Sequence, residues 1–282
     1  MIDPILITIL LGLFIGLVLA LTGAGGAILS LPLLVLFLDI KMIEAAPISL
    51  IAISISAGIA ALIGLRAGIV RYKAAGILAT FGILCAPIGV YVAHHLSEQT
   101  LAMLFSAVLF VVAWRSFKNM NVSPLLITNR TETINGKNLV KKIEPACALH
   151  PATSKLFWTA HCTVSLISTG GLSGFLSGLL GVGGGFIIVP TLQRISNLET
   201  KIITATSLAV IALVSIASTI SYAGNGTILW SIALPFTISM LSGMFLGRWL
   251  HDKIPNLIRM LMFSLLSLFI GLLMLLNMLF GN

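Results

Sequence analysis

The chain carries the same glycine-rich segment twice, as Thr22-Gly-Ala-Gly-Gly-Ala-Ile-Leu-Ser-Leu-Pro-Leu-Leu34 and as Leu180-Gly-Val-Gly-Gly-Gly-Phe-Ile-Ile-Val-Pro-Thr-Leu192. Each glycine lowers helix stability by about 1 kcal/mol relative to alanine, so consecutive glycines interrupt a helix. Glycines also permit positive φ angles and a close approach to the backbone. Both segments lie between long apolar runs, so the sequence predicts two broken helices in apolar surroundings.

The composition identifies those surroundings as a membrane. Apolar residues make up 58% of the 282 residues, charged residues only 9%, and the mean hydropathy is +1.13. A soluble domain has roughly a quarter of its residues charged. Because so few charges cannot cover a water-exposed surface, the composition excludes soluble enzymes and DNA-binding modules. The sequence predicts an all-α polytopic membrane protein with the lipid bilayer around it.

The apolar runs follow a regular series. A helix needs about 20 apolar residues to cross a bilayer. About eight hydrophobic segments approach that length, at residues 5–21, 47–65, 74–93, 96–117, 156–180, 204–222, 228–250 and 257–280. Two shorter runs, 27–38 and 186–195, each follow one of the glycine segments.

The second half of the chain repeats the first at a constant offset of 158 positions. Gly12 corresponds to Gly170, Gly23 to Gly181, and Pro32 to Pro190 in this register. A matched proline and one register over most of a repeat indicate an internal duplication. We therefore predict an N-terminal transmembrane repeat at 1–117, a polar cytoplasmic linker at 118–155 and a C-terminal transmembrane repeat at 156–282.

The distribution of charge predicts how the repeats are oriented. Inverted repeats would place 15 of the 16 basic residues on one side of the membrane, whereas parallel repeats would split them 10 to 6. Basic residues favour the cytoplasmic side, so inverted repeats are expected. The basic cluster from Arg115 to Lys155 is interpreted as part of a cytoplasmic loop, and no nucleic acid is expected as a partner. Inversion requires an odd number of crossings per repeat. Each repeat is then a re-entrant helical hairpin, broken at its glycines, followed by three spanning helices.

The glycine hinges are the candidate substrate site. Irregular backbone inside a bilayer is tolerated where it is buried in protein or lines a wet cavity. The short helix after each hinge, from about residue 27 or 186, would present free N–H groups and a positive dipole end, which together favour an anion. Packing of the helices alone would not need consecutive glycines. The candidate substrate-binding residues are Thr22, Gly23, Gly25, Gly26, Ser49, Gly181, Gly183, Gly184, Gly185, Thr206 and Ser207.

The sequence gives little support for a metal site or for catalytic residues. The pairs Cys147/His150 and His161/Cys162 lack a repeated ligand spacing, so no metal is expected. Arg248 and Arg259 either attract an anion or anchor the topology, and both interpretations stay open. No carboxylate pair or Ser/His/Asp set is placed for catalysis, so we expect no catalytic residue and no cofactor.

The duplicated Gly-x-Gly-Gly-Gly-x4-Pro pattern, from Gly181 to Pro190, resembles the TauE/SafE family of sulfite exporters, also called TSUP permeases, as does the following Ala205-Thr-Ser-Leu208. The first repeat departs from the pattern at Ala27 and at Pro47-Ile-Ser-Leu50. The resemblance covers nearly the whole chain. It implies a multi-pass protein of the bacterial inner membrane that carries sulfite, sulfonates or related small anions.

Two classes of function therefore remain. The first is a transporter, with export the expected direction, that binds a small sulfur-containing anion between the helix N-termini at the two hinges. The alternative is an integral membrane enzyme or an accessory subunit of a sulfur-metabolism complex. An enzyme normally places ionisable groups within its spans, and here the spans are nearly free of them, so we expect a carrier rather than an enzyme. The sequence leaves the anion and the oligomeric state open.

Overall fold

The computed structural model describes residues 4–120, 160–196, 198–224, 228–251 and 253–280, and within these ranges the secondary structure is helical with no strand assigned. The elements are α1 (Pro4–Thr22), η1 (Gly23–Leu29), α2 (Ser30–Leu38), α3 (Met42–Arg66), α4 (Tyr72–His95), α5 (Glu98–Met120), α7 (Ala160–Leu180), α8 (Gly185–Ile195), α9 (Thr200–Ala223), α10 (Trp230–His251) and α11 (Asn256–Phe280). The all-α polytopic fold predicted from the sequence is confirmed.

Seven of the described helices are long and apolar enough to cross a membrane, namely α1, α3, α4, α5, α7, α9 and α10. The apolar stretch of α11 is shorter, at Leu261–Asn277. The first helix of each half, α1 or α7, thus has spanning length by itself, while its partner in the hairpin, α2 or α8, has only 9 or 11 residues. Residues 118–120 of the predicted linker continue α5, and the remainder lies outside the described residues.

The pairing of the helices follows the internal duplication. When each helix is replaced by its equivalent 158 residues away in the sequence, the same large pairs are obtained. The most extensive pairs are α1 with α10 and α4 with α7, and each becomes the other when the halves are exchanged. The pairs α4 with α9 and α3 with α10 are related in the same way. The remaining large pairs, α3 with α9 and α5 with α11, each join two equivalent helices. In these large pairs, equivalent helices of the two halves therefore have equivalent partners.

Small residues allow these pairs to approach closely. A side chain on Gly16 would collide with the backbone carbonyl of Met240, and one on Gly174 would collide with that of Gly82. These two contacts are again related by the offset. Glycine at such positions lets neighbouring helix backbones touch, which is the common way of packing helices inside a membrane.

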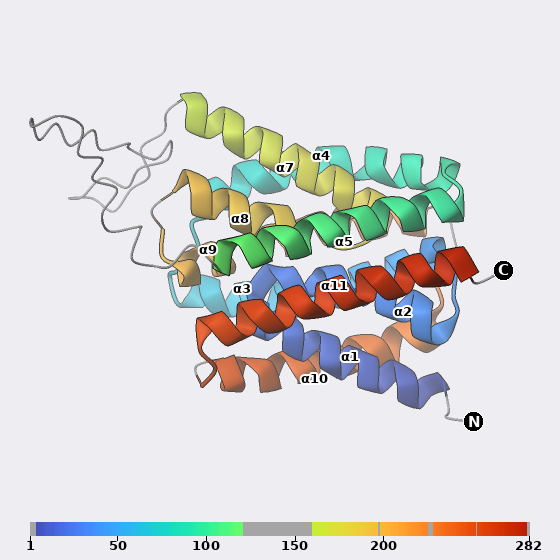
Figure 1. The fold of residues 1–282 in the computed structure, drawn as a ribbon. Coiled ribbons are helices and arrows are strands. Elements are labelled where there is room, and N and C mark those ends of the chain that lie inside the picture. Colours follow the sequence, from blue (N-terminus) through green and yellow to red (C-terminus); the bar gives the residue numbers. More distant parts are fainter. Residues whose placement is uncertain (1–3, 121–159, 197, 225–227, 252, 281–282) are drawn as a thin grey trace, which may run out of the picture.

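Figure 1 shows both chain termini at one end of the bundle. The last residues of α5 and the first of α7, which flank the undescribed segment 121–159, lie at the opposite end, here called the linker end. The helices α1 and α7 run in opposite directions between the two ends. This is the course that an inverted duplication predicts.

The two glycine hinges fold differently. In the first, Gly23 has a φ of 75° and begins η1, a 3-10 helix that runs directly into α2. The sequence-based start of this short helix at residue 27 was therefore wrong: glycines tighten the segment into 3-10 turns, and the α-helix begins at Ser30. In the second hinge, Gly181, Gly183 and Gly184 all have positive φ, and α8 begins at Gly185.

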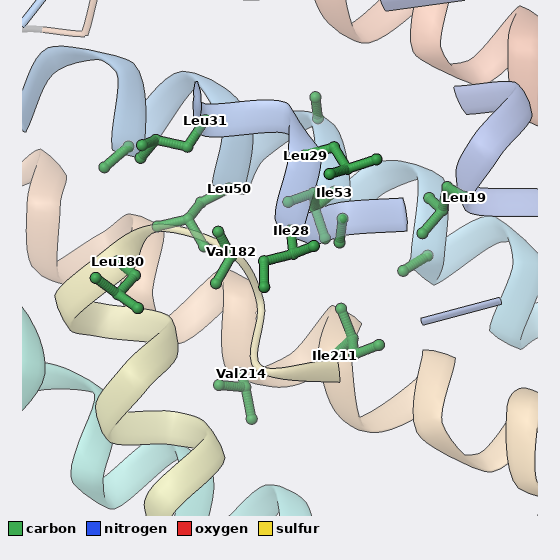
Figure 2. Packing of buried hydrophobic residues seen from close by; sticks show 14 of the residues in the cluster. Leu19, Ile28, Leu29, Leu31, Leu50, Ile53, Leu180, Val182, Ile211 and Val214 are labelled. Atoms are coloured by element: carbon green, nitrogen blue, oxygen red, sulfur yellow. The ribbon is translucent and has the colours of Figure 1, made fainter. Parts of the chain in front are cut away.

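The hinges meet in the buried centre of the bundle. Figure 2 shows Val182, on the second hinge, among Ile28 and Leu50 of the first half and Val214 of α9. All four side chains are inaccessible to solvent. Burial of apolar side chains from both halves thus holds the two broken helices together.

Candidate functional site

A cavity of about 1000 Å³ lies beside the first hinge. Its wall is built from α1, η1, α3, α5, α7, α8, α9, α10 and α11. The lining residues on α9 include Thr200 and Lys201, which belong to the first turn of that helix at the linker end (Figure 1). The cavity therefore extends from the linker end of the bundle to the hinge.

Four basic side chains line this cavity: Arg115, Lys201, Arg248 and Arg259. They come from four helices, and each lies near the helix terminus at the linker end. No Asp or Glu is among the described residues that line the cavity. A cleft lined by charges of one sign raises the local concentration of ions of the opposite sign. The cavity is therefore suited to attract an anion.

Arg259 joins this cationic group to the first hinge. Its Nη1 donates a hydrogen bond to the backbone carbonyl of Leu21, with a nitrogen–oxygen distance of 3.2 Å. Leu21 lies at the end of α1, two residues before Gly23. The contact places a guanidinium group at the point where the broken helix turns.

The basic side chains have no counterparts in the other half. In the 158-residue register, Arg115 corresponds to Leu273, Lys201 to Ile43, Arg248 to Val90 and Arg259 to Leu101. The duplicated helices therefore carry a cationic group at the linker end alone. This asymmetry could have been found in the sequence by comparing the charges of the two repeats position by position.

Four of the residues predicted for the site line the cavity: Thr22, Gly23, Gly25 and Gly185. Gly23 faces Thr204 of α9, whose Cγ2 would be 2.6 Å from a Cβ at Gly23. Gly25 faces the ring of Phe263, whose Cζ would lie 3.1 Å from a Cβ at Gly25. The first hinge and the beginning of α8 thus face one space.

The other predicted glycines pack against protein. A Cβ on Gly183 would lie 2.9 Å from Ile211 Cγ2 and from Ser215 Oγ. One on Gly184 would strike the backbone of Ser173, and one on Gly26 would strike that of Leu19. Gly181 faces Ala46 in the same way. These positions are not among the residues that line the cavity.

Three of the four predicted hydroxyl residues, Ser49, Thr206 and Ser207, also lie outside the cavity lining. Ser49 donates to the carbonyl of Gly181 at 2.6 Å and approaches that of Ala46 at 3.0 Å. Thr206 Oγ1 accepts a hydrogen bond from the backbone N–H of Arg71 at 3.1 Å. The hydroxyl of Ser207 is buried and has no hydrogen-bond partner in the described part of the chain. Ser49 and Thr206 thus connect segments that are distant in sequence.

Several lining residues were missed by the sequence analysis. They include Arg115, Gln193, Thr200, Lys201 and Thr204. Arg115 and Lys201 had been interpreted only as topological charges, because hydropathy does not show which helix ends share a cavity. Among the described residues no three His, Cys, Asp or Glu side chains gather in a way that could hold a metal ion. Cys147 and His150 lie outside the described residues.

Comparison with known proteins agrees with this architecture. The family model for the sulfite exporter TauE/SafE matches residues 8–274. A probable membrane transporter protein of Xylella fastidiosa (strain Temecula1) is 26% identical over 254 residues, covering 90% of this chain and 87% of its own length. The probable membrane transporter protein YunE of Bacillus subtilis is 24% identical over 272 residues, covering 94% and 95%.

A probable membrane transporter of Methanocaldococcus jannaschii is 37% identical over 120 residues, which is 39% of this chain and 44% of the relative. No solved structure matches the chain significantly. The family match spans nearly the whole chain, and the described helices include seven of spanning length. This multi-pass membrane protein therefore belongs to the TauE/SafE sulfite exporter family.

Proposed function

We propose that the protein exports small sulfur-containing anions, such as sulfite or organosulfonates, across the bacterial inner membrane. The main observation behind the proposal is the cavity at the linker end. Four basic side chains line this cavity, and it reaches both glycine hinges, at Gly23 and at Gly185. Anions from the cytoplasm would enter past the basic residues. The family match and the relatives that are probable membrane transporters support transport as the activity.

The anion would be held where the two hinges meet the cavity. Gly23 and Gly25 bring the backbone of the first hinge to the surface of the cavity, and Thr22 lies beside them. The N-terminus of α8 faces the same space through Gly185, Phe186 and Ile187. The first N–H groups of a helix bear partial positive charge; of these three residues, Ile187 donates its N–H to the carbonyl of Gly184 at 3.2 Å. An anion between them would also be within the field of Arg259.

Energy for export would come from the membrane potential. The described acidic residues are Asp39, Glu44, Glu98 and Glu199, and each lies within three residues of a helix end. A buried carboxylate is the common means of binding a coupling ion. The potential contributes about 2.3 kcal/mol per charge per 100 mV. Because the cell interior is negative, this force drives anions outward.

The test is counterflow of labelled sulfite and labelled methanesulfonate in proteoliposomes that contain only this protein. We expect uptake against an unlabelled anion inside, and a loss of apparent affinity of about tenfold or more in Arg259→Gln, because a charge-assisted hydrogen bond contributes about 1.5–3 kcal/mol. Lys73→Gln is the matched control, because Lys73 is exposed near the linker end and does not line the cavity. Absence of counterflow with every anion would contradict the proposal.

A further inference from the structure

One face of α9 carries three buried hydroxyl groups, from Ser215, Ser218 and Tyr222. Their spacing of three and four residues places them on the same side of the helix, over about 10 Å of its length. The row begins at the second hinge, because Ser215 Oγ would lie 2.9 Å from a Cβ at Gly183. It ends at Tyr222, whose ring centroid lies 5.4 Å from that of His94 in the last turn of α4. The row therefore leads from the hinge toward the end of the bundle where both termini lie, here called the termini end.

The helix α7 covers this row through two hydrogen bonds. The hydroxyl oxygens of Ser177 and Ser218 lie 3.2 Å apart and share a hydrogen bond. The hydroxyl of Tyr222 donates to the backbone carbonyl of Gly178 at 2.8 Å. The three side chains are at most 3% exposed. The contact between α7 and α9 is thus closed by polar groups that are shielded from solvent.

The equivalent place in the first half is open. The four residues of these two hydrogen bonds correspond, 158 positions earlier, to Leu19, Ala20, Ala60 and Gly64. All four of these equivalents line the cavity at the linker end. The helices α7 and α9 pack against each other, whereas the equivalent helices α1 and α3 make no comparable contact. One pair of helices is therefore closed at the termini end, while its equivalent borders a cavity at the linker end.

The hydroxyl of Ser215 is left without a hydrogen bond. It is fully buried and has no partner in the part of the chain that the structure describes. A buried hydroxyl without a partner raises the free energy of the protein, so such a group calls for an explanation. An anion at this place would accept its hydrogen bond. The hydroxyl lies beside Gly183, where the row on α9 meets the second hinge.

We propose that the contact between α7 and α9 is the outer gate of the transport path, and that Ser215, Ser218 and Tyr222 line the exit when this gate is open. The inference rests on the proposed function. Inverted repeats move against each other around a central site, so separation of α7 from α9 would accompany closure between α1 and α3. Opening frees the hydroxyls of Ser218 and Tyr222, which, with that of Ser215, would donate to a small oxyanion as it leaves the hinge. A neutral donor holds an anion less strongly than a guanidinium group does, so such an exit favours release.

A cross-link tests whether the gate has to open. Ser177→Cys with Ser218→Cys places two thiols where the hydroxyl oxygens lie 3.2 Å apart, and a disulfide needs about 2.05 Å between its sulfur atoms. We expect iodine to cross-link the double variant, seen as the loss of two maleimide-reactive thiols in the denatured protein. Counterflow of labelled methanesulfonate should then be lost, and reduction with dithiothreitol should restore it. Oxidation of either single variant, which lacks the partner thiol, should leave the rate of that variant as it was.

The hydrogen bond of Tyr222 is tested by Tyr222→Phe, which keeps the ring and removes the donor to Gly178. Loss of one hydrogen bond should shift the gate toward its open state by about two- to tenfold. In a Ser218→Cys background, an impermeant thiol reagent added at the termini end should react faster by about this factor. Labelling of Ala60→Cys from the linker end should not become faster, because Ala60 borders the cavity that is already open. Tyr91→Phe is the matched control and should change neither rate, because Tyr91 is 65% exposed on α4.

The outcomes separate the gate from the proposed function. Counterflow that persists in the cross-linked double variant would overturn the gate, and so would failure of the two thiols to cross-link. Unchanged labelling of Ser218→Cys would overturn it as well, and so would faster labelling of both cysteines, which a general loosening of the fold would explain. Absence of counterflow by the unaltered protein with every anion would instead overturn the proposed function, while the labelling experiment, which needs no substrate, would still test the gate.

Discussion

The hydroxyl of Ser49 donates a hydrogen bond to the backbone carbonyl of Gly181 at 2.6 Å, joining α3 of the first half to the hinge of the second. In the 158-residue register the corresponding residues are Ser207 and Gly23. Ser207 is buried, and its hydroxyl has no partner in the described part of the chain. The two halves thus differ at this contact, and the cavity lies on the Gly23 side, where the bond is missing.

Replacing Ser49 by alanine should lower the stability of the protein. The substitution removes a donor from the carbonyl of Gly181 in the buried centre, and leaving a buried polar group unsatisfied costs about 1–3 kcal/mol. Ser207→Ala is the matched control and should cost little, because that hydroxyl makes no hydrogen bond to the described residues. Unfolding in detergent, followed for both variants, measures the difference. Equal losses of stability would show that the Ser49 contact contributes nothing specific.

Two glycines should respond in opposite ways to substitution by alanine. In Gly174→Ala the new methyl group would strike the backbone of Gly82, so α4 and α7 would be forced apart and stability should fall by about 1–3 kcal/mol. Gly76 also lies in a helix, but no atom outside its own helix is within 4 Å of a Cβ there. Gly76→Ala should therefore be neutral or stabilising by up to about 1 kcal/mol. Thermal unfolding of the purified variants provides the comparison, and a stable Gly174→Ala protein would contradict the helix packing described.

The equivalent hinge glycines, Gly25 and Gly183, should also differ. Gly183 has a φ of 71° and is enclosed by Ile211 and Ser215, so Gly183→Val should reduce the yield of folded protein. Gly25 faces the cavity and the ring of Phe263. Gly25→Val should fold and carry anions more slowly, because the side chain narrows the space at the hinge. Expression and counterflow of both variants check this, and equal yields with equal rates would contradict the distinction.

The positions of the helices were predictable from the sequence, whereas the sequence predicted only part of the cavity lining. The eight long apolar runs correspond to α1, α3, α4, α5, α7, α9, α10 and α11. The third helix begins at Met42, five residues before the predicted start, because Glu44 in its first turn interrupts the apolar run and favours a helix N-terminus. Hydropathy detects burial in lipid, and it is insensitive to such polar first turns.

The site depends on contacts between residues far apart in the chain. Gly25 and Gly183 occupy equivalent positions in the repeats, yet one lines a cavity and the other is enclosed by α3 and α9. A duplicated motif cannot show such a difference, because it arises from which helices surround each copy. Arg115 and Lys201 likewise meet at one cavity only through the pairing of α5 and α9 with their neighbours.

The orientation in the membrane gives a further prediction. The linker end carries Arg66, Lys73 and the four cavity cations, whereas both termini lie at the other end. The positive-inside bias therefore places the linker end in the cytoplasm and the termini outside. A C-terminal alkaline phosphatase fusion should be active, and a C-terminal green fluorescent protein fusion should be dark. The reverse result would invert the proposed direction of entry into the cavity.

The most direct test of the central claim, that the protein exports anions by way of the basic cavity, is efflux of labelled methanesulfonate from proteoliposomes under a potassium–valinomycin potential. We expect efflux to be faster when the potential inside is negative than when it is positive, and Arg259→Gln to slow efflux under both conditions. The membrane potential acts on a transported anion with about 2.3 kcal/mol per 100 mV, so the two rates should be clearly separated. An efflux rate that is indifferent to the sign of the potential but depends steeply on a proton or sodium gradient would contradict the account.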